Sequence, residues 1–121
     1  MNDNEALEYI QKYFYELFGK KDLSVLERYL DPNYWDDDIG NNSVNHINDS
    51  KDYLQNWFEK NPTINVYVSK AQIANNVICA FLEWNQQTDG KVKTIMKGIG
   101  IFEIEGMKIV KRHSYIYYKM T

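Results

Sequence analysis

Hydrophobic and polar residues alternate along the C-terminal part of the chain, from residue 91 to residue 119. A period of two residues is typical of β-strands, in which successive side chains point to opposite faces. A break at Glu105–Gly106 divides this segment into two arms and predicts a long β-hairpin. Because apolar side chains occur on both faces, we expect helices to cover one face of the sheet and a second subunit the other.

In the first sixty positions, apolar residues recur at the three- and four-residue spacing of amphipathic helices. The pattern predicts three helices, over residues 5–20, 23–30 and 49–60. A short extended segment is expected before the third helix, over residues 34–40. Asn4 and Asp22 are the expected N-caps of the first two helices, and Asp49 or Ser50 that of the third. Asp31–Pro32 should end the second helix, because the residue before a proline is disfavoured in helical conformation.

Strand-like alternation also precedes the hairpin. We expect a strand over residues 77–86, with a turn before it at residues 75–76 and a turn after it at residues 88–90. The predicted order is helix, helix, short strand, helix and four strands, without a linker or repeat. This order predicts one α+β domain over residues 1–121. We expect a strongly bent antiparallel sheet that leaves a cavity at its open end, with the bend near Gly98 and Gly100.

The composition excludes several classes of protein. Hydrophobic residues make up 44% and aromatic residues 15% of the chain, which is enough for one folded core. The single cysteine and the polar N-terminus, which lacks a signal-peptide pattern, predict a cytoplasmic protein. No apolar run approaches the ~20 residues of a membrane span. The net charge of −3, with lysines interleaved among apolar residues, argues against binding to nucleic acid.

Three stretches carry a resemblance to a known family: Lys21–Leu23, Tyr34–Gly40 and Lys97–His113. Their order and spacing resemble the nuclear-transport-factor-2-like fold and, within it, the SnoaL-like polyketide cyclases and ketosteroid isomerases. The resemblance covers nearly the whole chain. It implies a cone-shaped, curved antiparallel sheet of the cystatin-like kind, with three N-terminal helices on its concave face. It also implies a homodimer that forms through the convex face of the sheet.

The resemblance carries over to the catalytic positions only in part. The base of the ketosteroid isomerases falls on Asp38, or on Asp37 after a slip of one residue. Their oxyanion-hole tyrosine and aspartate fall on Phe14 and Gly100, which have no side-chain donor. The acidic residue on the last strand of the cyclases falls on Ser114. The standard catalysis of either group is therefore not expected.

Asp38 and Arg112 are nevertheless the candidate catalytic pair, with Arg112 two residues before Ser114 on the same strand face. Burial in an aromatic cavity would raise the pKa of Asp38, whereas pairing with Arg112 would lower it. The candidate ligand-binding residues share an expected position around the cavity: Phe14, Trp35, Asp37, Phe58, Met96, Phe102, Ser114 and Tyr118. We expect no cofactor. We also expect no metal ion, because only alternate residues of Asp36–Asp38 share a strand face.

Three functions are compatible with these observations. The first is a domain that binds a small apolar or carbonyl-bearing molecule without catalysis, which the missing oxyanion donors and Ser114 favour. The second is a cofactor-free isomerase, cyclase or hydrolase with Asp38 as its general base. The third is a homodimeric protein-interaction module, which requires only the apolar outer face of the sheet.

Overall fold

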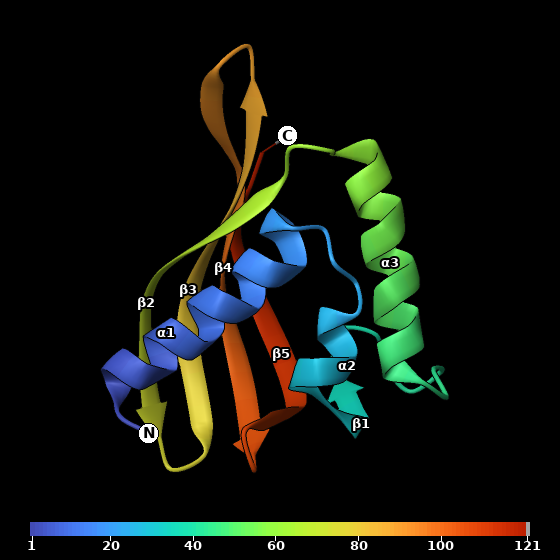
Figure 1. The fold of residues 1–121 in the computed structure, drawn as a ribbon, viewed down its shortest axis with the longest axis vertical. Helices are drawn as coiled ribbons and strands as arrows, with labels where there is room; N and C mark the ends of the chain where they lie inside the picture. Colours follow the sequence, from blue (N-terminus) through green and yellow to red (C-terminus); the bar gives the residue numbers. More distant parts are fainter. Residues whose placement is uncertain (121) are drawn as a thin grey trace.

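Four long strands form most of a five-stranded sheet in the computed structural model, which describes residues 1–120 (Figure 1). They are antiparallel neighbours and comprise β2 (Asn65–Ala74), β3 (Val77–Thr88), β4 (Lys91–Glu105) and β5 (Lys108–Lys119). The predicted long hairpin is thereby confirmed. Asn75, Asp89 and Gly106 have positive φ angles at the three tight turns, a conformation that Asn, Asp and Gly tolerate better than most residues.

The fifth strand, β1 (Leu30–Asp36), pairs in parallel with β5, so the strand order is β1-β5-β4-β3-β2. The sheet is therefore not entirely antiparallel. The sequence pattern did not predict this pairing, because residues far apart in the chain form it and local alternation contains no information on it. It has a direct consequence for the site, since it sets Asp36 opposite Arg112.

The helices are α1 (Asp3–Phe14), the π-helix η1 (Tyr15–Gly19), α2 (Val25–Tyr29) and α3 (His46–Lys60). The predicted first helix thus changes to π geometry at Tyr15. Its N-cap is Asn2 rather than Asn4, in a reciprocal capping box with Glu5. The third helix begins at His46, before its predicted start. The prediction placed the start too late because the first turn of the helix is polar and its sequence resembles a loop. None of the helices within residues 1–120 is long and apolar enough to cross a membrane.

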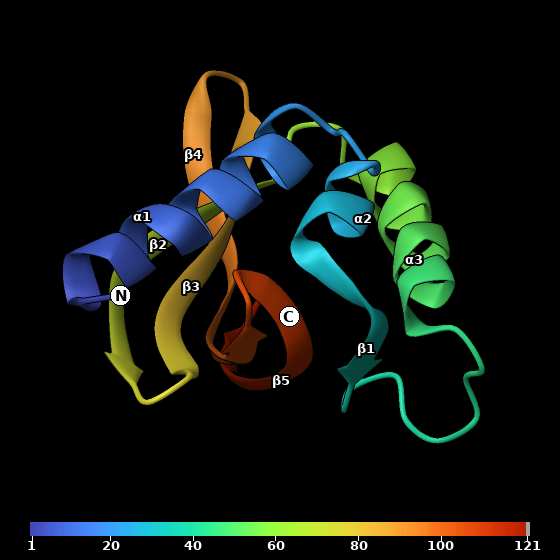
Figure 2. The same cartoon turned by 60° about the horizontal axis from the view of Figure 1, so that its bottom comes forward.

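The hydrophobic core is formed by side chains of the helices and of one face of the sheet. Figures 1 and 2 show α1 lying across this face. Phe14 of α1 and Phe102 of β4 meet at the centre of the core, with ring centroids 6.2 Å apart in an edge-to-face arrangement. Phe18 of η1 packs edge-on against Trp57 and Phe58 of α3. Aromatic contacts of this kind join α1 to the sheet and η1 to α3.

Register shifts interrupt the pairing of the long strands, and irregularities of this kind bend a sheet. Shifts lie between Lys97 and Gly98 of β4 and between Trp84 and Asn85 of β3. A Cβ atom added to Gly98 would lie 2.7 Å from the carbonyl oxygen of Tyr115, so only glycine permits this close approach. The extra residue in β5 at this point reverses the alternation of the residues that follow it.

Candidate functional site

A cavity of about 400 Å³ lies between the sheet and the helices η1, α2 and α3. Most of its wall is apolar and comprises Leu17, Phe18, Leu26, Leu30, Ile39, Leu54, Trp57, Trp84, Met96 and Ile116. The helix α3, which Figure 2 shows beside α2 and β1, supplies one side of this wall. The size and the largely apolar lining are typical of a site for a small organic molecule.

Polar side chains gather where β1 and β5 meet the cavity. Tyr34 and Asp36 project from one face of β1, and Arg112 and Ser114 project from the same side of β5. Tyr13 reaches this region from α1. The parallel pairing of β1 with β5 brings these groups together, although nearly eighty residues separate the two strands in the chain.

The guanidinium group of Arg112 lies on two aromatic rings. Its central carbon is 5.2 Å from the ring centroid of Phe102 and 5.6 Å from that of Phe14. Nε donates a hydrogen bond to Ser114 Oγ at 3.2 Å, and this is its only side-chain hydrogen bond within residues 1–120. The terminal nitrogens form no ion pair with a carboxylate in this part of the chain. They are therefore free to donate hydrogen bonds to a molecule in the cavity.

Tyr13 and Tyr34 line the cavity as neutral hydroxyl donors. Burial raises the pKa of Tyr13 to about 12, although Arg112 opposes the shift, and burial raises the pKa of Tyr34 as well. Tyr34 donates a hydrogen bond to Asp36 Oδ2 at 3.0 Å. Tyr13 is only 2% exposed, yet its hydroxyl forms no hydrogen bond within residues 1–120. It is a second free donor beside Arg112.

Asp36 ends β1 and forms hydrogen bonds that hold the acidic turn, which comprises Asp36, Asp37 and Asp38. Its Oδ1 accepts a hydrogen bond from the backbone N–H of Asp38 at 2.9 Å, and its own N–H donates to Nδ1 of His46 at 2.9 Å. Asp38 reaches the cavity from this turn rather than from the strand. The side chain of Asp38 remains 46% exposed, so solvent reaches it from one side.

The pKa of Asp38 is raised above its ordinary value. Burial is the main cause, and the negative charge of Asp36 adds to it. Arg112, His113 and a backbone hydrogen bond from Ser114 act in the opposite direction and are weaker. Of the two opposing effects considered from sequence, burial therefore outweighs the attraction to Arg112.

Several of the candidate residues lie around the cavity and others lie elsewhere. Asp38, Arg112, Met96 and Ser114 line it. Phe14 and Phe102 are core residues under the guanidinium of Arg112 and do not form the wall.

Trp35 and Asp37 face away from the cavity, because they alternate with Tyr34 and Asp36. The Trp35 ring packs on His46 with centroids 4.1 Å apart, and its Nε1 donates to Asp37. Asp37 lies 3.8 Å from Nζ of Lys111 and 3.7 Å from Nδ1 of His113. Both side chains therefore stabilise the β1–β5 edge rather than contact a ligand in the cavity.

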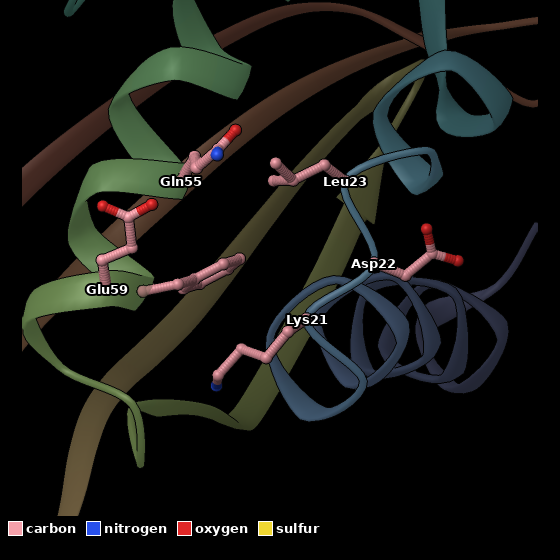
Figure 3. A pocket seen from close by; sticks show the side chains of 6 residues that line it. Lys21, Asp22, Leu23, Gln55 and Glu59 are labelled. Carbon is pink, nitrogen blue, oxygen red and sulfur yellow. The ribbon is translucent and has the colours of Figure 1, made fainter.

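Phe58 borders a different hollow, of about 450 Å³, between α3 and the segment Lys21–Leu23 (Figure 3). The ammonium of Lys21 is already engaged there, because it donates to the carbonyls of Phe18 and Ile64 and lies over the Phe58 ring. In Figure 3 the carboxylate of Asp22 points away from α3. This shallow hollow therefore offers little to orient a ligand, and the chemistry of the chain is concentrated in the other cavity.

Tyr118 is 44% exposed and lies outside the cavity, where Lys97 approaches its ring. Strand alternation predicts it on the inner face with Ser114 and Ile116. The register shift beside Gly98 reverses that alternation, so that Lys119 lines the cavity instead. An insertion of one residue in a strand leaves no distinct pattern in a single sequence.

Tyr13 and Tyr34 line the cavity but were not expected there from the sequence, and Asp36 lines it although the family pattern favoured Asp38 or Asp37. Tyr13 follows Ile10 by three positions and precedes Leu17 by four, so helical spacing alone places it on the buried face. Of Tyr13 and its neighbour Phe14, however, only Phe14 was expected at the cavity from the sequence.

Groups of three or more possible metal ligands are absent from residues 1–120. Of the three carboxylates in the acidic turn, those of Asp36 and Asp38 line the cavity and that of Asp37 does not. Asp37 and Asp38 both lie near Nδ1 of His113, at 3.7 and 3.8 Å.

Comparison with known proteins identifies a family and a fold. The sequence pattern of the SnoaL-like domain matches residues 11–112. A search of curated proteins found no match. Solved structures with the same fold include TsrD from Streptomyces laurentii, at 14% identity and a TM-score of 0.75, with 97% of this chain and 92% of that chain covered.

Two further structures of the same fold are candidates for two different activities. A candidate SnoaL-like polyketide cyclase from Jannaschia sp. CCS1 has 14% identity and a TM-score of 0.70, with 95% and 87% of the two chains covered. AclR from Streptomyces galilaeus, a candidate hydroxylase, has 11% identity and a TM-score of 0.72, with 93% and 79% covered. At these identities the likeness concerns the fold, and the activity must be argued from the site.

Proposed function

Because this chain belongs to the SnoaL-like domain family, we propose that its cavity binds a small, largely apolar molecule through a carbonyl oxygen. The observation that carries the proposal is the pair of free donors, the terminal nitrogens of Arg112 and the hydroxyl of Tyr13, at one end of an apolar cavity. A carbonyl oxygen has two lone pairs and can accept from both. An apolar body would fill the remaining space against Trp84 and Met96.

The second candidate function is proton abstraction next to that carbonyl group. It is favoured by Asp38, which lines the same cavity and has a raised pKa, as a general base requires. The carboxylate of Asp38 would take a proton from the carbon beside the carbonyl, and the electron pair would move onto the carbonyl oxygen. Arg112 and Tyr13 would then stabilise the negative charge on that oxygen. This step needs no cofactor, and it would serve an isomerase or a cyclase.

A thermal-shift titration with small ketones, such as 2-tetralone, tests ligand binding directly. The melting temperature of the wild type should rise with ketone concentration, because the ligand binds only the folded state. Arg112→Met should weaken binding about 10- to 100-fold, since hydrogen bonds to a charged donor contribute about 1.5–3 kcal/mol.

The matched control is Lys119→Met, which removes the same charge from the rim of the same cavity. It should leave the affinity close to that of the wild type, because Lys119 is exposed to water. A melting temperature that does not respond to any ketone would contradict the proposal. Equal losses in the two variants would show that charge, rather than the position of Arg112, governs binding.

We further propose that the outer face of the sheet forms a homodimer. Within residues 1–120, all the helices that pack on the sheet lie on its other face. Phe81, Ile99 and Tyr115 are register partners across three strands of the outer face, and Phe81 and Tyr115 are 40% and 59% exposed. A row of exposed apolar side chains of this kind is typical of an interface between subunits.

Tyr115→Lys should convert the dimer to a monomer, because two buried ammonium groups would meet across the symmetric interface. Light scattering after size-exclusion chromatography measures the mass directly. Tyr15→Lys is the matched control, since Tyr15 is 63% exposed but lies on η1, away from the sheet face. A wild type that elutes as a monomer at all concentrations would contradict the proposal.

A further inference from the structure

His46 is buried at the start of α3 in a way that the packing alone does not require. It is 5% exposed, and its ring stacks on Trp35. Nδ1 accepts a hydrogen bond from the N–H of Asp36, so the neutral ring carries its proton on Nε2. Nε2 is buried without a hydrogen-bond partner in residues 1–120. A buried donor without a partner destabilises the fold, and an apolar side chain of similar size would avoid that cost.

The imidazole contributes a fixed hydrogen-bond acceptor for the backbone N–H of Asp36. The carboxylate of Asp36 in turn accepts hydrogen bonds from Tyr34 at 3.0 Å and from the N–H of Asp38 at 2.9 Å. One continuous set of hydrogen bonds thus extends from His46 to the turn that carries Asp38. None of its links is longer than 3.0 Å.

His46 also connects two walls of the cavity. It belongs to α3, whose residues Ser50, Leu54 and Trp57 form one side of the cavity, and it bonds to β1, which supplies Asp36 on another side. The position of α3 relative to the acidic turn is therefore set at this contact. A displacement of about 1 Å at such a point can lower a reaction rate by as much as 10²-fold.

We propose that His46 is a positioning residue that holds the acidic turn, and with it the carboxylate of Asp38, in the orientation needed at the cavity. The inference rests on the proposed general-base function. His46 does not itself line the cavity, so it acts through Asp36 rather than on the ligand.

Two substitutions of His46 separate positioning from packing. His46→Asn retains an acceptor at the position of Nδ1, because the amide oxygen occupies the same place on the side chain, whereas His46→Leu retains only apolar bulk. The first readout is the rate at which the protons beside the carbonyl of 2-tetralone exchange with deuterium. The second is the pH titration of the Asp38 carboxyl carbon by nuclear magnetic resonance, which requires no ligand.

Leucine should lower the exchange rate roughly tenfold or more and shift the titration midpoint of Asp38, while asparagine should restore both. The matched control is Asn45→Ala. Asn45 is the N-cap of α3, and its side chain accepts from the N–H of Asn48, so the variant weakens the same helix end without touching Asp36.

Asn45→Ala should leave the Asp38 titration unchanged. An unchanged titration midpoint in His46→Leu would overturn the inference, as would an equal shift in Asn45→Ala. If the wild type exchanges no protons, the proposed general-base function fails. The carbon titration then still decides whether His46 positions Asp38.

Discussion

Replacing Phe102 with alanine is expected to lower the free energy of unfolding by about 3–5 kcal/mol, as for other large core aromatics. Such a loss would remove a large part of the ~5–15 kcal/mol that stabilises a typical domain. Phe102 is fully buried, meets the ring of Phe14 and lies under the guanidinium of Arg112. Its truncation would leave a void in the core and remove the surface on which Arg112 lies. Urea unfolding followed by tryptophan fluorescence measures the change.

Phe58→Ala is the matched control for this prediction. The Phe58 ring is only partly buried and borders the shallow hollow beside α3, although it contacts Phe18. Its loss should cost about 1–2 kcal/mol, because less apolar area returns to water. Equal losses in the two variants would contradict the view that the core is centred on the contact between α1 and β4.

The architecture could be predicted from the sequence because its signals are local. Alternation over β3 to β5 and turn residues such as Asn75 and Gly106 determine strands and hairpins within short windows. The resemblance to the SnoaL-like family added the curved sheet with helices on one face. A short strand was expected over residues 34–40, but its parallel pairing with β5 was missed because the partner lies almost eighty residues away.

The candidate site could be predicted only in part, and the reason differs from residue to residue. Asp38 was carried over from the family pattern, and Arg112 was placed by strand alternation on the same face as Ser114; both line the cavity. Helical spacing places Tyr13 on the buried face of the first helix, whereas the family pattern aligned the catalytic tyrosine with Phe14. The position of Tyr34 and Asp36 at the cavity depends on the parallel pairing, which sets Asp36 opposite Arg112 and could not be predicted from local sequence.

Tyr118 illustrates a limit of strand alternation as a guide. A period of two remains reliable only as long as the register is unbroken, and one additional residue reverses every later position. The shift beside Gly98 exchanges the roles of Tyr118 and Lys119 in this way. The glycines indicated that the sheet bends here, but not which strand contains the extra residue.

Asp38→Asn is expected to lower the rate of proton exchange beside the carbonyl of 2-tetralone by about 10²- to 10⁴-fold, the usual contribution of a general base. The amide is similar in size to the carboxyl group but cannot take up a proton at neutral pH. Binding of the ketone should persist, because Arg112 and Tyr13 still donate to its oxygen. Proton nuclear magnetic resonance in deuterium oxide measures the exchange, and a thermal-shift titration measures the binding.

The pH dependence of exchange and of stability should have opposite signs. Exchange requires the ionised form of Asp38, so its rate should rise with pH through a pKa that burial and Asp36 place above the ordinary value. Because the pKa is higher in the folded state than in the unfolded chain, folding favours the protonated carboxyl. The stability that this group contributes is therefore present at low pH and lost as pH rises through the folded-state pKa.

At neutral pH, Asp38→Asn should thus unfold at the same temperature as the wild type or slightly higher, while it loses exchange. This combination distinguishes a carboxylate retained for chemistry from one retained for structure, since a structural ion pair would make the variant less stable. A variant that exchanges protons at the wild-type rate would exclude Asp38 as the base. Ketone binding through Arg112 and Tyr13 would then stand as the function of the cavity.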